Sequence, residues 1–440
     1  SLPVKVTARK DGKTAELNFT LNVVSTWNSV PTVTDVFFDD FSQGVDSTRW
    51  EVSSQRWGSG VGASPNNVFF SRDQEIAAAE GCESGGIVAM RTFGDYKEEE
   101  NLRRQGAVLV TRDAFGPGKF EVRAKIVPRL GQCTAFWTYW NGGGTTKETN
   151  RYSEIDIEMP MNSDYRKWSG TTYKYFVDWQ VLAERGTVTA EKSDGVNDGQ
   201  WHVWAFEWRT DDANGDNKVV WYLDGKKMFE IRDYTPEYTA SFWIGNWFPA
   251  DLGWVGVPNF EEAYMYIDWV RITQYNDPIK TGLVKNNTPG GLATDLGSNP
   301  IPKNQYVANS TFKQVSGGNY VAWDKRGTVS GGGSNPVAIG PQSKLTQIIT
   351  AQYPGYSFDL RVDGRVSAGG GKLKVYVQYM FGSVARGKSD EVIFDAGSFT
   401  EKTLSFTIPR TINSTDIRIV LETEADTTAE VRKVEMYMRR

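Results

Sequence analysis

The sequence predicts an all-β protein, and the spacing of apolar residues carries that prediction. Between residues 35 and 275, short runs of alternating apolar and polar residues are broken by Gly, Asn and Asp, and no long run has a helical period. The same alternation returns beyond residue 303. The clearest expected strands are Gly118–Ile126, Trp201–Trp208, Lys218–Leu223, Ala263–Thr273, Tyr356–Val362, Leu373–Phe381, Leu404–Ile408 and Asp416–Glu422.

A chain of 440 residues is too long for one ordinary core, so several domains are expected. Residues 1–30 predict a hairpin around Asp11-Gly12, with strands Pro3–Ala8 and Thr14–Val24, either the remnant of an immunoglobulin-like module or an edge added to the next domain. Residues 31–278 form the first large β-domain, and residues 303–440 a second β-sandwich. Between them, residues 279–302 are rich in Asn, Thr, Pro and Gly, which is typical of a linker.

The composition excludes several classes of function. A net charge of −5 provides no cationic field for nucleic acid or anionic membranes, and no apolar run is long enough to span a bilayer. With one histidine, His202, and two cysteines, Cys82 and Cys133, neither a Ser-His-Asp relay nor a Cys/His zinc site is expected. Catalysis therefore has to depend mainly on carboxylates. Whether the two cysteines pair stays open, since spacing does not decide it.

The segment from Arg151 to Pro160 carries the most chemical information. On a strand, side chains alternate between faces, so Glu154, Asp156 and Glu158 share one face and the intervening apolar residues take the other. Like charges this close repel one another, and that cost is unusual unless protons are shared or a ligand is handled there. The pattern therefore predicts a catalytic site.

The same spacing indicates a reaction class. Two glutamates four residues apart have Cα atoms about 13 Å apart, and inward-leaning side chains bring their carboxylates to roughly 5 to 6 Å. A retaining glycosidase uses that separation, whereas an inverting one needs roughly 6.5 to 9.5 Å. Asp156 lies between Glu154 and Glu158, where it can share a hydrogen bond and keep one carboxyl protonated. The alternatives are a solvated strand face and a calcium site. A regular strand with bulky Ile spacers is less suited to calcium, whose ligands come from turns and backbone carbonyls.

The residues around this strand resemble those of glycoside hydrolase family 16. The matching segments cover residues 35 to 275 and have the order and spacing of that family. They are Phe37–Phe41 with Trp50, Gly118–Lys125, Ala135–Trp137, Glu154–Glu158, Trp204–Trp208, Trp221–Gly225 and Ile267–Arg271.

This resemblance implies a curved antiparallel β-sandwich of jelly-roll type with an open cleft. It implies that Glu154 is the nucleophile, Glu158 the general acid and then base, and Asp156 the auxiliary acid. The strand lacks the extra residue of the Glu-x-Asp-x-x-Glu form, so it is similar to the lichenase and xyloglucan-active branches. The expected activity is that of a retaining endo-glycosidase acting on a β-glucan with mixed 1,3-1,4 or 1,3 linkages.

Two features set this sequence apart from those relatives. The apolar run 106–111 stands where they often place a polar sugar contact, and Ser153 stands where lichenases often have an acid. The alternatives are therefore a galactan of the agar, porphyran or carrageenan type, another host glycan, or a noncatalytic glycan-binding protein of the same fold.

Flat aromatic rings are the expected platforms for sugars, because they bury area on a pyranose face with few rotatable bonds. Trp57 is a weaker candidate than the others. Tyr173 and Tyr175 are expected to hydrogen-bond near the cleaved sugar, and Asn246 belongs to the cleft-strand segment Gly245–Pro249 that resembles lichenases. The predicted substrate-binding residues are Trp137, Trp140, Tyr173, Tyr175, Asn246, Trp247 and Trp254.

No cofactor is expected for catalysis, but family 16 relatives often hold a structural calcium ion. The resemblance places Asp268 at that metal site, and His202 is given no role. Residues 303–440 are similar to carbohydrate-binding modules of the family 4 and 9 type, with Tyr320 and Trp323 as the expected glycan contacts. We expect a monomer that is secreted, periplasmic or at the cell surface, from which a signal segment has been removed.

Overall fold

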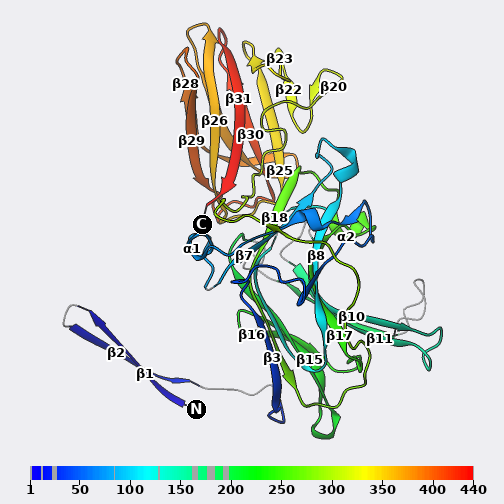
Figure 1. Cartoon of the computed structure of the whole chain (residues 1–440). Helices are drawn as coiled ribbons and strands as arrows, with labels where there is room; N and C mark the ends of the chain where they lie inside the picture. The colour runs from blue at the N-terminus through cyan, green and yellow to red at the C-terminus, as the bar shows by residue number, and fades with distance from the viewer. Residues whose placement is uncertain are drawn as a thin grey trace.

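The computed structural model places the chain in two β-sandwiches and a projecting N-terminal hairpin (Figure 1). It describes residues 2–10, 13–21, 27–83, 85–126, 129–160, 167–175, 184–191 and 198–439. The prediction of an all-β protein is confirmed, because the described α-helices are α1 (Gln74–Ala79) and α2 (Leu252–Val255) alone. Three single-turn 3-10 helices lie at Pro65–Asn67, Glu100–Leu102 and Asp212–Asn214.

The first sandwich has one sheet that carries the acidic motif, here called the cleft sheet. Its neighbouring strands are all antiparallel. In order across the sheet they are β4 (Trp50–Val52), β8 (Gln105–Phe115), β17 (Ala240–Trp247), β10 (Cys133–Gly143), β11 (Arg151–Pro160), β12 (Lys167–Tyr175) and β13 (Glu184–Glu191).

The opposing sheet, here called the outer sheet, is organised around the long strand β18. One edge of β18 pairs with β7 and then β3, and the other edge pairs with β9. The short strand β5 (Gly62–Ala63) pairs with β8. The strands of the outer sheet are β6 (Val68–Ser71), β7 (Ile87–Phe93), β3 (Val33–Asp39), β18 (Glu262–Tyr275), β9 (Gly118–Lys125), β14 (His202–Asp211), β15 (Asp216–Leu223) and β16 (Lys226–Ile231).

A buried aromatic core joins the two sheets and fixes the acidic strand. Trp221 of β15 is fully buried, and its indole Nε1 donates 2.8 Å to the carbonyl oxygen of Asp156 across the sandwich. Gly170 of β12 leaves room for that indole, because a Cβ atom at this position would lie 2.4 Å from the Trp221 ring. Since the interior is closely packed, the core residues on the interior face of β11 fix the position of this strand.

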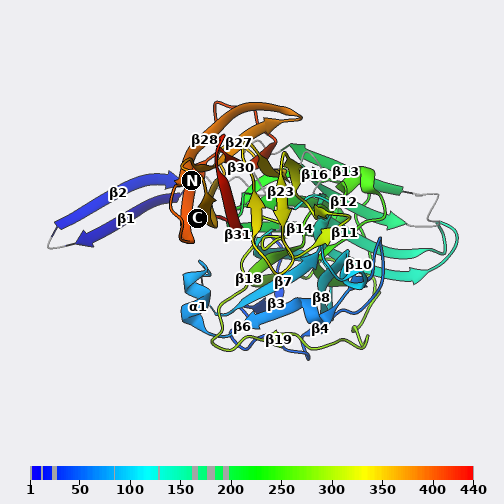
Figure 2. The same ribbon diagram turned by 90° about the horizontal axis from the view of Figure 1, so that it is seen from above.

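The N-terminal hairpin stands apart from both sandwiches. Strands β1 (Leu2–Lys10) and β2 (Lys13–Leu21) pair with each other in a two-stranded sheet, which projects from the body in both views (Figures 1 and 2). The predicted turn at Asp11-Gly12 and the end of the predicted second strand lie outside the described residues.

The segment predicted as a linker is an ordered strap on the first sandwich. Asn286 Nδ2 donates 2.7 Å to Glu51 Oε2, and Leu296 N donates 2.8 Å to the carbonyl of Phe70. Strand β19 (Thr294–Asp295) pairs in parallel with β6. The segment has the Asn- and Gly-rich composition of a linker, but its backbone is hydrogen-bonded along the surface of the first sandwich. Composition alone does not reveal such pairing.

The second sandwich packs two five-stranded sheets against each other. One sheet has the order β22-β25-β30-β27-β28 and the other β23-β24-β31-β26-β29, with the small hairpin β20-β21 beside them. The strands are β20 (Val315–Ser316), β21 (Asn319–Tyr320), β22 (Asp324–Arg326), β23 (Val329–Gly331), β24 (Val337–Ile339), β25 (Lys344–Thr350), β26 (Ser357–Ala368), β27 (Leu373–Phe381), β28 (Val384–Phe394), β29 (Thr400–Thr407), β30 (Asp416–Thr423) and β31 (Thr428–Met438).

The prediction that Tyr320 and Trp323 contact glycan is wrong. Each side chain is only 4 % exposed, and both rings pack against Phe312 in the core. Trp323 Nε1 donates 3.1 Å to the carbonyl of Ala308 and is therefore satisfied internally. An aromatic residue in a β-sandwich serves packing as readily as ligand contact, and the sequence does not distinguish the two.

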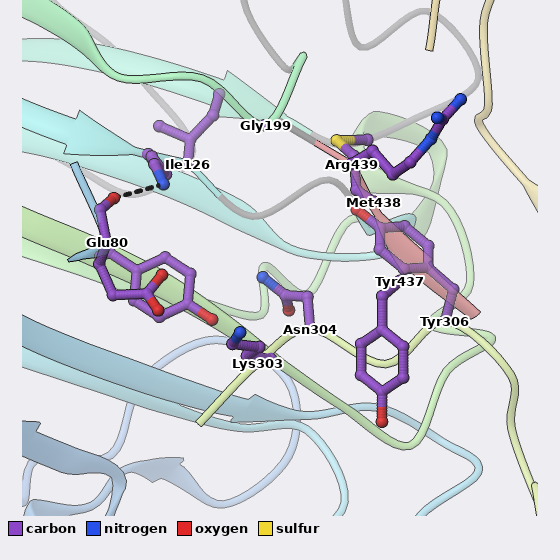
Figure 3. Close-up of a pocket in the computed structure, with 11 residues that line it drawn as sticks. Glu80, Ile126, Gly199, Lys303, Asn304, Tyr306, Tyr437, Met438 and Arg439 are labelled. Atoms are coloured by element: carbon purple, nitrogen blue, oxygen red, sulfur yellow. Dashed lines mark hydrogen bonds between the residues drawn. The ribbon is translucent and has the colours of Figure 1, made fainter. Parts of the chain in front are cut away.

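The two sandwiches meet through a polar and aromatic contact. Arg129 is buried with its guanidinium 3.7 Å from the ring centre of Tyr306, and Glu261 accepts 2.7 Å from the backbone N of Asn309. A cavity of about 130 Å³ lies at this junction, lined from both domains (Figure 3). The dashed line in Figure 3 is the 3.0 Å hydrogen bond from Lys125 Nζ to the Glu80 carbonyl oxygen.

Candidate active site

The acidic motif lies on β11 in the middle of the cleft sheet. Hydrogen-bonded neighbours on both sides fix its register: Glu154 stands opposite Tyr139 of β10 and Tyr173 of β12, and Asp156 stands opposite Trp137. Glu154, Asp156 and Glu158 all line one open cleft of about 610 Å³. The interior-facing side chains of Ile155 and Ile157 are almost fully buried, as alternation requires.

Burial and mutual repulsion control the protonation of these acids. Burial raises the pKa of Glu154 to about 7, against the opposing hydrogen bonds from Tyr152 and Asp156. Burial, followed by the charges of Glu154 and Glu158, raises the pKa of Asp156 well above its ordinary value. At neutral pH the proton shared by this pair therefore resides on Asp156, which donates to the Glu154 carboxylate.

Aromatic side chains form one wall of the cleft. Trp137 of β10 stacks on Trp243 of β17 with ring centres 5.4 Å apart, and Trp57 meets Trp243 edge-on at 6.2 Å. Trp247 lines the cleft as well. Sequence reasoning missed Trp243, although alternation along β17 places it on the same face as Trp247.

The remaining predicted contacts are distributed differently. Tyr173 lines the cleft, but Tyr175, Trp140, Asn246 and Trp254 are not among its lining residues. Trp140 occupies the opposite face of β10 and packs on Tyr238 with ring centres 5.2 Å apart, so the prediction of a sugar platform does not fit its position.

Asn246 and Trp254 lie beside the cleft and not in it. Asn246 is fully buried and accepts 2.6 Å from Thr134 Oγ1, because even-numbered residues of β17 face the interior. Trp254 in α2 contacts Trp247 edge-on at 6.4 Å, and thus supports a cleft residue from behind.

Asp268 is the residue at which a structural calcium ion is expected, and that ion stays a prediction. The carboxylate is fully buried and forms an ion pair with the Arg123 guanidinium, while the backbone N of Glu83 donates 2.9 Å to the same oxygen. Among the described residues, no group of three or more His, Cys, Asp or Glu side chains could hold a metal ion. The Arg123 guanidinium pairs with one oxygen of the Asp268 carboxylate.

The single histidine and the two cysteines lie in different surroundings. His202 lies between Asp224, 2.8 Å from Nδ1, and Asp198, 3.1 Å from Nε2. Burial lowers its pKa, but the two aspartates outweigh burial and hold the pKa above its ordinary value. Cys82 and Cys133 are both free thiols, and Cys133 is buried on the cleft-facing side of β10, where it packs with Ala135 and Val255.

Sequence comparison assigns a family to this geometry. Residues 64–271 match the family model described as glycosyl hydrolases family 16. That range contains the acidic strand and most of both sheets of the first sandwich. Residues 64–271 are a family 16 glycoside hydrolase domain. The prediction that the chain carries a hydrolase domain of endo-glucanase type is thereby confirmed.

Curated relatives of the family 16 domain carry the names of β-glucanases. A β-glucanase of Acetivibrio thermocellus is 27 % identical over 218 residues, covering 49 % of this chain and 55 % of that protein. A Bacillus subtilis β-glucanase is 27 % identical over 54 % of this chain and 86 % of its own length. The endo-1,3-1,4-β-glycanase ExoK of Rhizobium meliloti is 27 % identical over 55 % of this chain and 80 % of its own length. The chain thus spans about half of the first relative.

Solved structures with a similar fold include two β-glucanases. The Bacillus licheniformis β-glucanase covers 55 % of this chain and 100 % of its own, with a TM-score of 0.41 and 19 % identity. A lichenase from a mouse hindgut metagenome covers 56 % of this chain and 100 % of its own, with a TM-score of 0.39 and 24 % identity. In the described part of this chain, no helix is long and apolar enough to cross a membrane.

Proposed function

We propose that this protein is a retaining endo-glycosidase that cleaves internal β-linkages of a glucan by double displacement. The observation that carries the proposal is the alignment of Glu154, Asp156 and Glu158 on one face of β11, inside an open cleft with an aromatic wall. A cleft open to solvent accepts the middle of a polymer, as endo-cleavage requires. Glu154 is the proposed nucleophile, Glu158 the general acid and base, and Asp156 the auxiliary acid.

In the first step, a carboxylate oxygen of Glu154 bonds to the anomeric carbon while the bond from that carbon to the leaving oxygen breaks. Glu158 gives its proton to the leaving oxygen, and one half of the glycan departs. In the second step Glu158 accepts a proton from water, whose oxygen bonds to the anomeric carbon and releases the Glu154 carboxylate. The sugar keeps its anomeric configuration, and both acids return to their starting states.

The electrostatics of the site support these roles. Glu154 has to be ionised to attack, and burial opposes that ionisation by raising its pKa to about 7. Hydrogen bonds from Asp156 and Tyr152 favour the ionised form. The proposed enzyme therefore loses activity as the pH falls below about 7, with one proton inactivating the nucleophile.

The proposed substrate is a neutral β-glucan with 1,3-1,4 or 1,3 linkages. The names of the curated relatives support this choice, as does the aromatic wall, which suits uncharged pyranose faces. The alternative is a galactan bearing sulfate groups. It is favoured by Arg56, an exposed side chain that lines the cleft beside Trp57 and carries a charge suited to an anionic sugar.

The test is a screen of soluble glycans with the purified chain, with products identified by mass. Internal cleavage of mixed-linkage β-glucan or laminarin into oligosaccharides, with the β-anomer appearing first by NMR, is the expected result. Release of the α-anomer first would disprove the retaining mechanism. Cleavage of sulfated galactan alone would contradict the β-glucan proposal and support the alternative substrate.

We also propose that the C-terminal sandwich binds glycan in the manner of carbohydrate-binding modules, and that the protein acts outside the cell. The support for binding is a hollow of about 500 Å³ against β27, β28 and β30, lined by Tyr376, Lys388 and Glu422 among others. We expect the Glu154→Gln chain to be retained on an insoluble β-glucan. We expect Tyr376→Ala to abolish that retention. Equal retention of both variants would remove this hollow from consideration.

A further inference from the structure

We infer that Tyr152 is a positioning residue for the proposed nucleophile, holding one oxygen of the Glu154 carboxylate in place for attack. The inference rests on the proposed function, since Glu154 needs a fixed orientation only if it attacks a sugar. Its basis is a direct contact: the Tyr152 hydroxyl donates a hydrogen bond to Glu154 Oε2. Both side chains belong to β11 and stand two residues apart, so strand alternation places them on the same face.

The phenol is held from its other side as well. The Tyr152 ring meets Tyr139 of β10 edge-on, with ring centres 5.7 Å apart and planes at 88°. Tyr139 in turn contacts Trp243 edge-on at 5.9 Å. Tyr152 is only 5 % exposed, so few alternative rotamers are open to it. The donor is therefore preorganised before substrate arrives.

Protonation supports the direction of this hydrogen bond. Burial, together with the charge of Glu154, raises the pKa of Tyr152, so its hydroxyl keeps its proton throughout the pH range of interest. A permanent donor beside a carboxylate favours the ionised form and leaves the second oxygen to other contacts. Tyr152 thus fixes the orientation of the nucleophile and opposes the rise in pKa that burial causes.

The experiment compares Tyr152→Phe with a matched control on the outer sheet, Tyr275→Phe. Tyr275 also donates a hydrogen bond to a glutamate, Glu207, at 2.8 Å, and it lies outside the cleft. Each variant loses one phenolic hydroxyl. The measurements are the pH profile of kcat and KM on soluble mixed-linkage β-glucan, and the titration of Glu154 by isotope-edited infrared spectroscopy, with Glu154→Gln used to assign its band.

For Tyr152→Phe we expect the acid limb of kcat and the infrared titration to move up by about one pH unit, because a charged hydrogen bond is lost. At pH 6, kcat falls about 10-fold with little change in KM, and the loss is smaller at pH 8. Tyr275→Phe leaves both titrations in place. A purely structural role would lower the melting temperature of Tyr152→Phe without moving either titration, and that result would overturn the inference.

The outcomes separate this inference from the proposed function. If the wild-type chain cleaves no glycan, the proposed function fails, and the infrared titration still decides whether Tyr152 controls Glu154. If the wild-type chain is active and both titrations are unchanged in Tyr152→Phe, the positioning role fails and the proposed function stands.

Discussion

The acids of the cleft sheet and the acids around Arg209 on the outer sheet are stabilised in opposite ways. In the outer sheet, Arg209 is almost fully buried, and its Nη2 donates 3.1 Å to Asp277, whose other oxygen accepts from Arg209 Nε. In the cleft sheet, burial raises the pKa values of Glu154 and Asp156. The neighbouring groups that alter these values are the Tyr152 phenol and the other acids of the site. The first arrangement compensates its charges, whereas the second leaves them in conflict.

This difference distinguishes a structural cluster from a reactive one. Hydrogen bonds from the Asn28 and Ser29 backbones outweigh burial and hold the pKa of Asp216 below its ordinary value, so the outer-sheet acid is ionised at neutral pH. The pKa of Glu154 is instead raised to about 7, where a small change of environment alters its proton occupancy. Groups with shifts of this kind are concentrated at functional sites because catalysis needs them near the working pH.

The largest expected effect comes from removing the acids of the cleft. Glu154→Gln and Glu158→Gln should each lower kcat by about 10³-fold or more, because the nucleophile or the proton donor is lost while volume is conserved. The measurement is the initial rate on soluble β-glucan, with circular dichroism to show that the fold persists. The matched control is Glu207→Gln on the outer sheet, which should retain wild-type kcat. Near wild-type turnover in either cleft variant would contradict the assigned roles.

The second prediction tests the outer sheet. Arg209→Met should lower the free energy of unfolding by about 3–5 kcal/mol, because it leaves Asp277 buried without its guanidinium. Activity per folded molecule should be unchanged, since Arg209 does not line the cleft. Denaturant titration and active-site-normalised rates measure the two effects. If Arg209→Met had unaltered stability and a low kcat, Arg209 would serve activity and not stability, which would contradict the comparison between the sheets.

The third prediction concerns the pH dependence of stability. Folding raises the pKa of Glu154 from 4.5 to about 7, so its contribution to stability is fully present below pH 4.5 and is lost as the pH rises through 7. Glu154→Gln carries no such charge and should gain stability relative to wild type between pH 5 and pH 8. Melting temperatures at both values provide the measurement. An identical difference at the two pH values would show that Glu154 does not titrate in this interval.

The smallest expected effect compares the two faces of one strand. Trp137→Ala should raise KM by about 2- to 10-fold, because one aromatic contact is worth about 0.5–1.5 kcal/mol. Trp140→Ala, on the opposite face of β10, should leave KM unchanged and lower the melting temperature through the lost contact with Tyr238. Steady-state kinetics and thermal melts on the same preparations measure both. A larger rise in KM for Trp140→Ala would contradict the proposal that the sugar contacts the cleft face of β10.

The sequence predicted the strands more reliably than the surroundings of their side chains. The expected strand Leu373–Phe381 has the observed bounds, and Gly118–Ile126 ends one residue beyond β9. Alternation also groups Tyr152 with the three acids, a signal present in the sequence that the prediction of the site did not include. Which face of a strand meets solvent is a different question, and the structure places Trp140 and Asn246 outside the lining of the cleft.

What the sequence determined by itself is local: an all-β chain, and three acids that a period of two sets on one face of a single strand. Only the tertiary structure decided what surrounds each face. It brought Trp243 against Trp137, gave Asp268 the Arg123 guanidinium as partner, and buried Tyr320 and Trp323 in a core. The reason is physical, because burial, pairing and pKa depend on residues far apart in the chain, whereas strand periodicity depends on neighbours alone.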